Sequence, residues 1–143
     1  MPAYQIPYQQ IQAAASPAFP AGRLIKRPAL VLALRNGQNR LNCHALVDSG
    51  ADHCVFPRSF MHPLGLDPLT APLDTTSGVG STNVPTHYCN VTLDLGPIHF
   101  QVYAGFTTGM DPYGIGLLGQ DGFFDKFRII FDHEHGIYTL EAP

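Results

Sequence analysis

The 143-residue sequence predicts an all-β domain, folded as a small closed β barrel with one or two short helices. Charged residues make up only 13% of the chain, while 14 glycines and 13 prolines supply many turn formers. Apolar and polar residues alternate with a period of two in the most strongly patterned segment, and no strand–helix–strand rhythm is visible. The chain is long enough for one domain with a substantial core.

The N-terminal part predicts an unstructured segment followed by a hairpin. Residues 1–22 are rich in Gln, Ala, Pro and Tyr, and they carry no charge and no apolar period, which favours a flexible arm. The folded domain is therefore expected to span residues 23–143. Residues 29–34 form a continuous apolar run, and Asn36-Gly37 is a strong hairpin turn that leads into a second strand at residues 41–47.

The centre of the chain carries the clearest strand pattern. Cys89, Val91, Leu93 and Leu95 fall on one face, and the alternation continues beyond Gly96-Pro97 over residues 98–104. Alternation on both sides of a turn predicts a β-hairpin with one buried face. The remaining expectations are a strand at residues 54–56, a helical turn at 59–64, a polar loop at 70–83, strands at 115–118, 127–131 and 137–140, and a short helix at 120–125.

The most informative segment is residues 45–52, which read Ala-Leu-Val-Asp-Ser-Gly-Ala-Asp. An apolar strand ends in Asp48, which is followed by a hydroxyl residue and by Gly50, whose backbone is the least restricted. A carboxylate at the end of a buried strand is costly unless its charge is used. If two copies of this loop met, their carboxylates would share one proton, an arrangement that can activate a water molecule.

This segment resembles the catalytic loop of retroviral-type (retropepsin-like) aspartic proteases, written D-[ST]-G-A. A second motif of that family, two aliphatic residues and a glycine, is matched by Leu117-Leu118-Gly119. Between the two motifs the family places a glycine-rich flap. The matching flap residues here are Ser77, Gly78, Val79, Gly80 and Ser81. The resemblance covers about residues 23–141, with all motifs in family order, and it implies a retropepsin-type barrel.

The resemblance implies a homodimeric aspartic endopeptidase that needs no metal or organic cofactor. Each chain would contribute one catalytic Asp48 and would act on a peptide or protein substrate held under the flap. The residues that would support the active-site loop are Ser49, Gly50, Ala51, Asp52, Leu118 and Gly119. The alternative is a retropepsin-fold module that is weak or inactive as an enzyme and only binds peptides or dimerises.

Two positions depart from the family pattern. Gln120 stands where many members carry an arginine that pairs with the acid corresponding to Asp52, so this ion pair is missing unless Arg58 or Arg128 replaces it. Ala51 also lacks the hydroxyl that serine-bearing relatives offer to the catalytic carboxylates. The missing ion pair and the absence of an aromatic residue at the flap tip are the reasons for keeping the inactive alternative.

Composition and charge limit the binding partners and the cellular compartment that can be expected for this chain. The net charge is −3 without a basic cluster, which gives little support to nucleic-acid binding. No stretch approaches the roughly 20 apolar residues of a membrane span, and no secretory signal is visible. Three cysteines without tight spacing fit reduced thiols, so we expect a cytoplasmic protein.

Other interpretations of the same residues were weighed. Asp48-Ser49-Gly50 could be a plain surface turn, but the preceding apolar run and the second motif argue against it. Phosphoaspartate hydrolases need a second acid two positions later, where this chain has Gly50. Gly78-Val79-Gly80 lacks the strand-to-helix context of a phosphate-binding loop. Cysteine and histidine pairs at 43–44, 53–54 and 87–89 match no zinc spacing, which favours free thiols over a zinc-binding domain.

Overall fold

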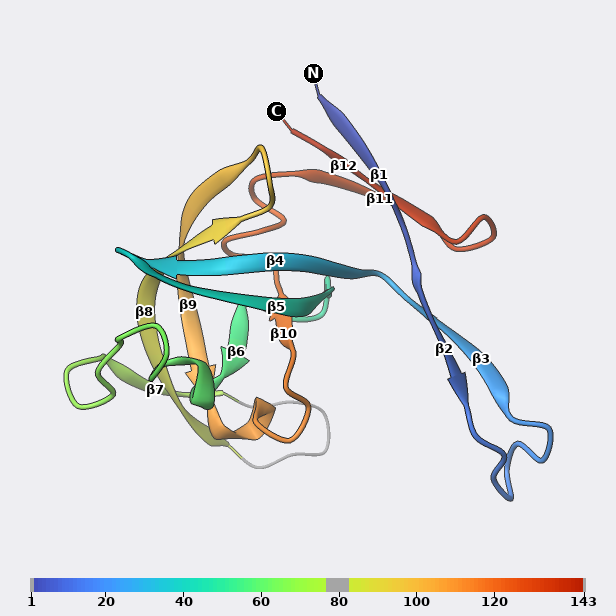
Figure 1. Cartoon of the computed structure of the whole chain (residues 1–143), viewed down its shortest axis with the longest axis horizontal. Coiled ribbons are helices and arrows are strands. Elements are labelled where there is room, and N and C mark those ends of the chain that lie inside the picture. Colours follow the sequence, from blue (N-terminus) through green and yellow to red (C-terminus); the bar gives the residue numbers. More distant parts are fainter. Residues whose placement is uncertain (1, 77–82, 143) are drawn as a thin grey trace. The chain divides into compact units, whose positions relative to one another are not determined.

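The structure is a computed structural model that describes residues 2–76 and 83–142. Almost all regular structure in these residues is β, which confirms the predicted all-β class (Figure 1). The elements are β1 (Ala3–Pro7), β2 (Gln9–Ala13), β3 (Arg23–Arg27), β4 (Ala29–Asn36), β5 (Asn39–Val47), β6 (Val55–Pro57), η1 (Arg58–Phe60), β7 (Leu73–Thr76), β8 (Val84–Asp94), β9 (His99–Thr107), η2 (Thr108–Met110), β10 (Gly116–Leu118), β11 (Arg128–Asp132) and β12 (Ile137–Glu141). Within the same residues, no helix has the length and apolar character needed to cross a membrane.

The chain divides into two compact units, residues 30–126 and residues 1–29 with 127–143. The larger unit is built on a seven-stranded sheet with the order β4-β5-β10-β6-β9-β8-β7. Because β4 also pairs with β8, six of these strands close into a ring and β7 is added beside β8. The ring brings strands from distant parts of the sequence next to β5, whose end carries Asp48.

The predicted hairpin in the centre of the chain is confirmed as β8 and β9. Val91 faces Val102 and Leu93 faces Phe100 across the antiparallel pair. Val91, Leu93 and Val102 are buried, whereas Gln101 on the other face is exposed. The burial pattern therefore follows the period of two read from the sequence.

The hairpin joining β4 and β5 also forms at the predicted place, with Gly37 at a φ of 60° in the turn. The core of the larger unit consists of aromatic and aliphatic side chains. Phe56 and Phe106 are fully buried, with ring centroids 5.9 Å apart. This core holds β9 beside β6, and β6 pairs in turn with β10. The position of the Asp48 loop depends on β10, which accepts the bond from Asp48 N.

The smaller unit contains a three-stranded sheet, β1-β12-β11, and a separate two-stranded sheet, β2-β3. The sequence predicted no ordered structure before residue 23. This prediction is wrong, because residues 3–7 form β1 and residues 9–13 form β2. β1 pairs with the C-terminal β12 in a register that sets Ile6 opposite Tyr138. A partner more than a hundred residues away leaves no local signal in a Gln-rich segment. The domain boundary at residue 23 remains a prediction.

The short helix expected at residues 120–125 is not formed. The segment is a series of turns in which Phe124 N donates to Gly119 O at 3.2 Å and Lys126 N donates to Phe123 O at 3.0 Å. Gly122 has a φ of +105°, a value that a regular helix does not allow. The helical turn expected at 59–64 is confirmed in part, since η1 occupies its beginning.

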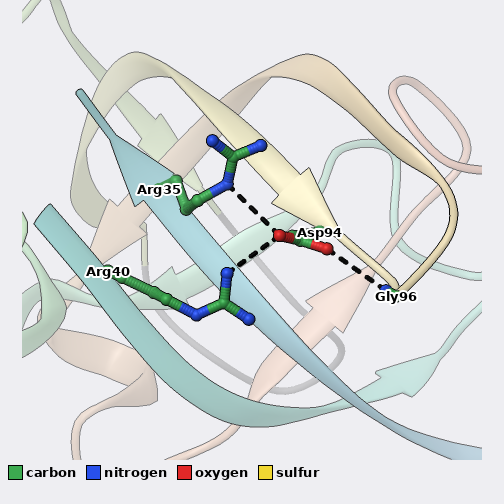
Figure 2. Close-up of polar contacts among 4 residues, drawn as sticks. All are labelled: Arg35, Arg40, Asp94 and Gly96. Atoms are coloured by element: carbon green, nitrogen blue, oxygen red, sulfur yellow. Dashed lines mark hydrogen bonds and ion pairs between the residues drawn. The ribbon is translucent and has the colours of Figure 1, made fainter. Parts of the chain in front are cut away.

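An ionic cluster lies where the ring of strands closes (Figure 2). Asp94, at the end of β8, has its Oδ2 atom 2.9 Å from Arg40 Nη1 and 3.3 Å from Arg35 Nε. Its Oδ1 atom accepts a bond from Gly96 N at 3.2 Å. The hydrogen bond from Arg40, followed by the bond from Gly96, lowers the pKa of Asp94 below its usual range. The cluster connects β4, β5 and β8 at their ends.

Replacing Asp94 with Asn should destabilise the protein at neutral pH, because the charge-assisted hydrogen bond from Arg40 and the ion pair with Arg35 are lost. The folded pKa is lowered, so this stabilisation is fully present above the ordinary Asp pKa of about 3.9 and is lost as the pH falls through the lower folded value. The difference in urea midpoint between the wild type and Asp94→Asn should therefore shrink below about pH 4.

Glu134→Gln is the control for this experiment, because Glu134 is an exposed carboxylate in the β11–β12 turn. Its urea midpoint should follow that of the wild type at every pH. A gap between wild type and Asp94→Asn that stays constant into acid would show that the ionic cluster does not stabilise the fold.

Candidate active site

Asp48 is the first residue after β5, and its backbone is held by the neighbouring strand. β10 runs parallel to β5, with Leu118 opposite Val47. Asp48 N donates to Leu118 O at 3.0 Å and extends this pairing by one bond. The predicted support residue Leu118 is fully buried, so the start of the Asp48 loop is anchored to the core.

The loop after Asp48 folds back onto the carboxylate. Gly50 N donates to Asp48 Oδ1 at 2.9 Å, and Ala51 N donates to Asp48 O at 3.2 Å. This is the turn that an Asp side chain makes with the backbone two residues on. Asp48 is half-buried, while Ser49 and Gly50 are exposed. The carboxylate is thus oriented at an exposed loop, where a second molecule can approach it.

The segment after β10 holds the loop from the other side. Gln120 N donates to Ala51 O at 2.8 Å, and Asp121 N donates to Asp52 O at 2.9 Å. The Gln120 side chain adds a third bond, from Nε2 to Ser49 O, at 2.8 Å. The two sequence motifs are therefore in direct contact, as their resemblance to the family implied.

In the sequence, Gln120 stands out only because it occupies a position where many family members carry an arginine. The structure gives it a neutral link to the loop in place of an ion pair. Arg128 lies 3.7 Å from Glu141 instead, and Arg58 is exposed at the start of η1. Within residues 2–76 and 83–142, Arg58 forms no ion pair with Asp52.

Gly119 allows the close approach between the two motifs. A Cβ atom at this position would collide with the carbonyl oxygen of His53 and would lie 2.6 Å from that of Ala51. Both obstacles are backbone atoms in or next to the Asp48 loop, which cannot move aside as a flexible side chain could. The glycine in the second motif is thus required by the lack of space for a side chain.

His53 follows the loop and lies against an aromatic pair. Its Nδ1 atom is 3.4 Å from Asp121 Oδ2, and its ring meets Tyr88 edge-on at a centroid distance of 5.7 Å. Tyr88 in turn stacks on Tyr103 at 5.4 Å. These contacts give His53 a packing role beside the loop.

The flap residues Ser77, Gly78, Val79, Gly80 and Ser81 lie outside the described residues. The strands on either side of them are described: β7 and β8 are antiparallel, with Thr76 opposite Val84. The expected flap segment therefore joins two paired strands, and its assignment remains a prediction.

The cysteines do not gather into a metal site within the described part of the chain. No group of three or more His, Cys, Asp or Glu side chains suited to a metal ion is found there. All three cysteines are free, and burial raises the pKa of Cys43 to about 12 and that of Cys54 to about 11. Burial therefore disfavours the thiolate form of these two side chains.

Comparison with known families decides the relationship. The family model described as "Aspartyl protease" matches residues 32–121, a range that contains both motifs. The chain belongs to the aspartyl protease family. A comparison of this aspartyl protease family member with curated proteins gave no match.

A solved structure shares the fold of this aspartyl protease family member. It is the crystal structure of a retropepsin-like aspartic protease from Rickettsia conorii, with a TM-score of 0.59 and 15% sequence identity. The match covers 92% of this chain and 98% of that one. At this identity the likeness shows the retropepsin-like fold.

Gly119→Ala should destabilise this aspartyl protease family member by roughly 3 kcal/mol or more, because the new methyl group has to displace backbone atoms of the catalytic loop. Chemical denaturation of the purified variant measures the loss. Gly109→Ala is the matched control, since a Cβ atom there would have no neighbour closer than 3.7 Å. Equal stability of the two variants would mean that the loop does not lie against Gly119 as described.

Proposed function

We propose that the protein is an aspartic endopeptidase in which two copies of the chain each contribute Asp48 to one active site. The observation that carries the proposal is the held geometry of the Asp48 loop. One carboxylate oxygen accepts the Gly50 N–H, and the loop backbone is bonded to β10 and to the segment that follows it. Such fixed orientation of a half-exposed carboxylate is what acid–base catalysis requires.

The need for two chains follows from the number of suitable aspartates. The sequence holds one D-[ST]-G triplet, at Asp48. The other Asp-x-Gly triplet, Asp94-Leu95-Gly96, turns the β8–β9 hairpin, and Asp94 is bound by Arg35 and Arg40. Since peptide hydrolysis by this chemistry takes two carboxyl groups, a second copy must supply the other one.

The mechanism uses a shared proton. Two carboxylates at short distance do not both ionise, so one Asp48 is protonated and its partner is charged. The charged carboxylate removes a proton from a water molecule, whose oxygen attacks the scissile carbonyl carbon. The protonated carboxyl group donates its proton to the carbonyl oxygen. Collapse of the resulting diol, with proton transfer to the amide nitrogen, breaks the carbon–nitrogen bond.

The proposed substrate is an extended peptide. It would pair with the backbone of the segment that contains Gly78, Val79 and Gly80, and the enclosed site would exclude water. No metal or organic cofactor takes part in this chemistry. The three free thiols support the further proposal that the enzyme works in the reducing cytoplasm.

Asp48→Asn should lower the turnover of a diverse peptide library by about 10³-fold or more, because the amide cannot act as a base. Asp67→Asn serves as the control, since Asp67 only caps a surface turn by accepting a bond from Leu69 N. Pepstatin should inhibit the wild type. Peptide binding without turnover in the wild type and in Asp48→Asn alike would select the inactive binding module instead.

Mixing the two proteins tests the shared site. Adding excess Asp48→Asn chain to a fixed amount of wild type should reduce activity, because mixed dimers hold only one carboxylate. Excess Asp67→Asn chain should not inhibit. Unchanged activity with a large excess of Asp48→Asn, in a preparation shown to exchange subunits, would contradict the two-chain site.

A further inference from the structure

The Gln120 side chain reaches the catalytic carboxylate through a single peptide group. Its Nε2 atom donates to Ser49 O at 2.8 Å. The same peptide, between Ser49 and Gly50, presents its N–H to Asp48 Oδ1 at 2.9 Å. Gln120, the Ser49–Gly50 peptide and Asp48 therefore form one continuous chain of hydrogen bonds, from side-chain amide to carboxylate.

The direction of the first bond follows from the groups involved. A backbone carbonyl only accepts, so the Gln120 amide must present its NH₂ group to Ser49 O. A donor on the carbonyl oxygen draws electron density through the peptide and makes its N–H a stronger donor. It also fixes the peptide plane, and with it the direction of the N–H. Both effects strengthen the hydrogen bond from Gly50 N to the Asp48 carboxylate.

We propose that Gln120 is a positioning residue of the active site, whose side-chain amide orients and polarises the Ser49–Gly50 peptide that donates to Asp48. The proposal rests on the proposed protease function for its catalytic meaning, although the bond itself does not. Gln120 touches neither substrate nor water in this role. It acts through the peptide, on the carboxylate that serves as the base.

The side-chain bond can be removed without detaching the loop. Gln120 N to Ala51 O and Asp121 N to Asp52 O are backbone bonds, which a substitution at position 120 leaves in place. Gln120 is exposed, so its side chain can be changed without opening the core. Variants at this position therefore separate positioning of the carboxylate from folding of the loop.

Two variants carry the test. Gln120→Leu has no donor. Gln120→Glu has the same shape, but its ionised carboxylate repels Ser49 O, whereas its protonated form can donate again below about pH 4. The neighbouring titratable groups Asp48, Asp52, His53 and Asp121 are the same in all variants. Gln101→Glu, on the exposed face of β9, is the control for the added charge.

The first measurement is the pH dependence of peptide cleavage. Gln120→Leu should lower kcat about three- to tenfold, the loss of one hydrogen bond, with KM little changed. The acid limb of its profile should move to higher pH, since the charged base is less stabilised. Gln120→Glu should match Gln120→Leu at neutral pH and approach the wild type in acid, while Gln101→Glu should follow the wild type throughout.

The second measurement does not depend on activity. In ¹⁵N-labelled protein, the Gly50 amide proton should move upfield in Gln120→Leu relative to the wild type, because its bond to Asp48 is weaker. In Gln120→Glu the resonance should return toward the wild-type position as the pH falls. If the wild type cleaved no peptide, the proposed function would be wrong. The chemical shift of the Gly50 amide proton would still test the role of Gln120. A Gly50 shift and a pH profile identical to the wild type in Gln120→Leu would overturn the inference.

Discussion

The parallel pairing of β5 with β10 is the interaction on which the rest of the site depends. Parallel strands place their carboxyl ends at the same edge of a sheet, so the residues after Val47 and after Leu118 meet although Ser49 and Gln120 are 71 residues apart in the chain. The bond from Asp48 N to Leu118 O is the last of this pairing. The backbone bonds from Gln120 and Asp121 to the loop, and the close pass at Gly119, are possible because these two ends are adjacent.

The two Asp-x-Gly turns of the chain show how the same local structure takes on different roles. In both, the carboxylate accepts the N–H of the glycine two residues on, at 2.9 Å for Asp48 and 3.2 Å for Asp94. Asp94 is also bonded to Arg40 and paired with Arg35, so its charge is used in closing the ring. In the part of the chain that the structure describes, Asp48 forms no such ion pair. A carboxylate without a fixed cation is left available for proton transfer.

The sequence predicted the features whose signal is local. The alternation on both sides of Gly96 gave the β8–β9 hairpin, and the run that ends at Val47 gave the strand before Asp48. What it missed depends on distant partners or on side-chain direction. The segment over residues 3–13 is polar and becomes β-structure by pairing with β12 and β3. In the sequence, Gln120 indicated the loss of an arginine and of its ion pair. The bond from its side-chain amide to Ser49 O depends on the direction of the side chain, which the sequence does not reveal.

A neutral link at Gln120 differs in physical character from the arginine–carboxylate pair that it replaces. An exposed ion pair is screened by salt and is lost when its acid is protonated. An amide–carbonyl bond does not titrate and is far less sensitive to ionic strength. The link from Gln120 to Ser49 O therefore does not use the charge of Asp52. A neutral link is weaker than a charge-assisted ion pair. The backbone bonds from Gln120 N and Asp121 N are therefore important for holding the loop in place.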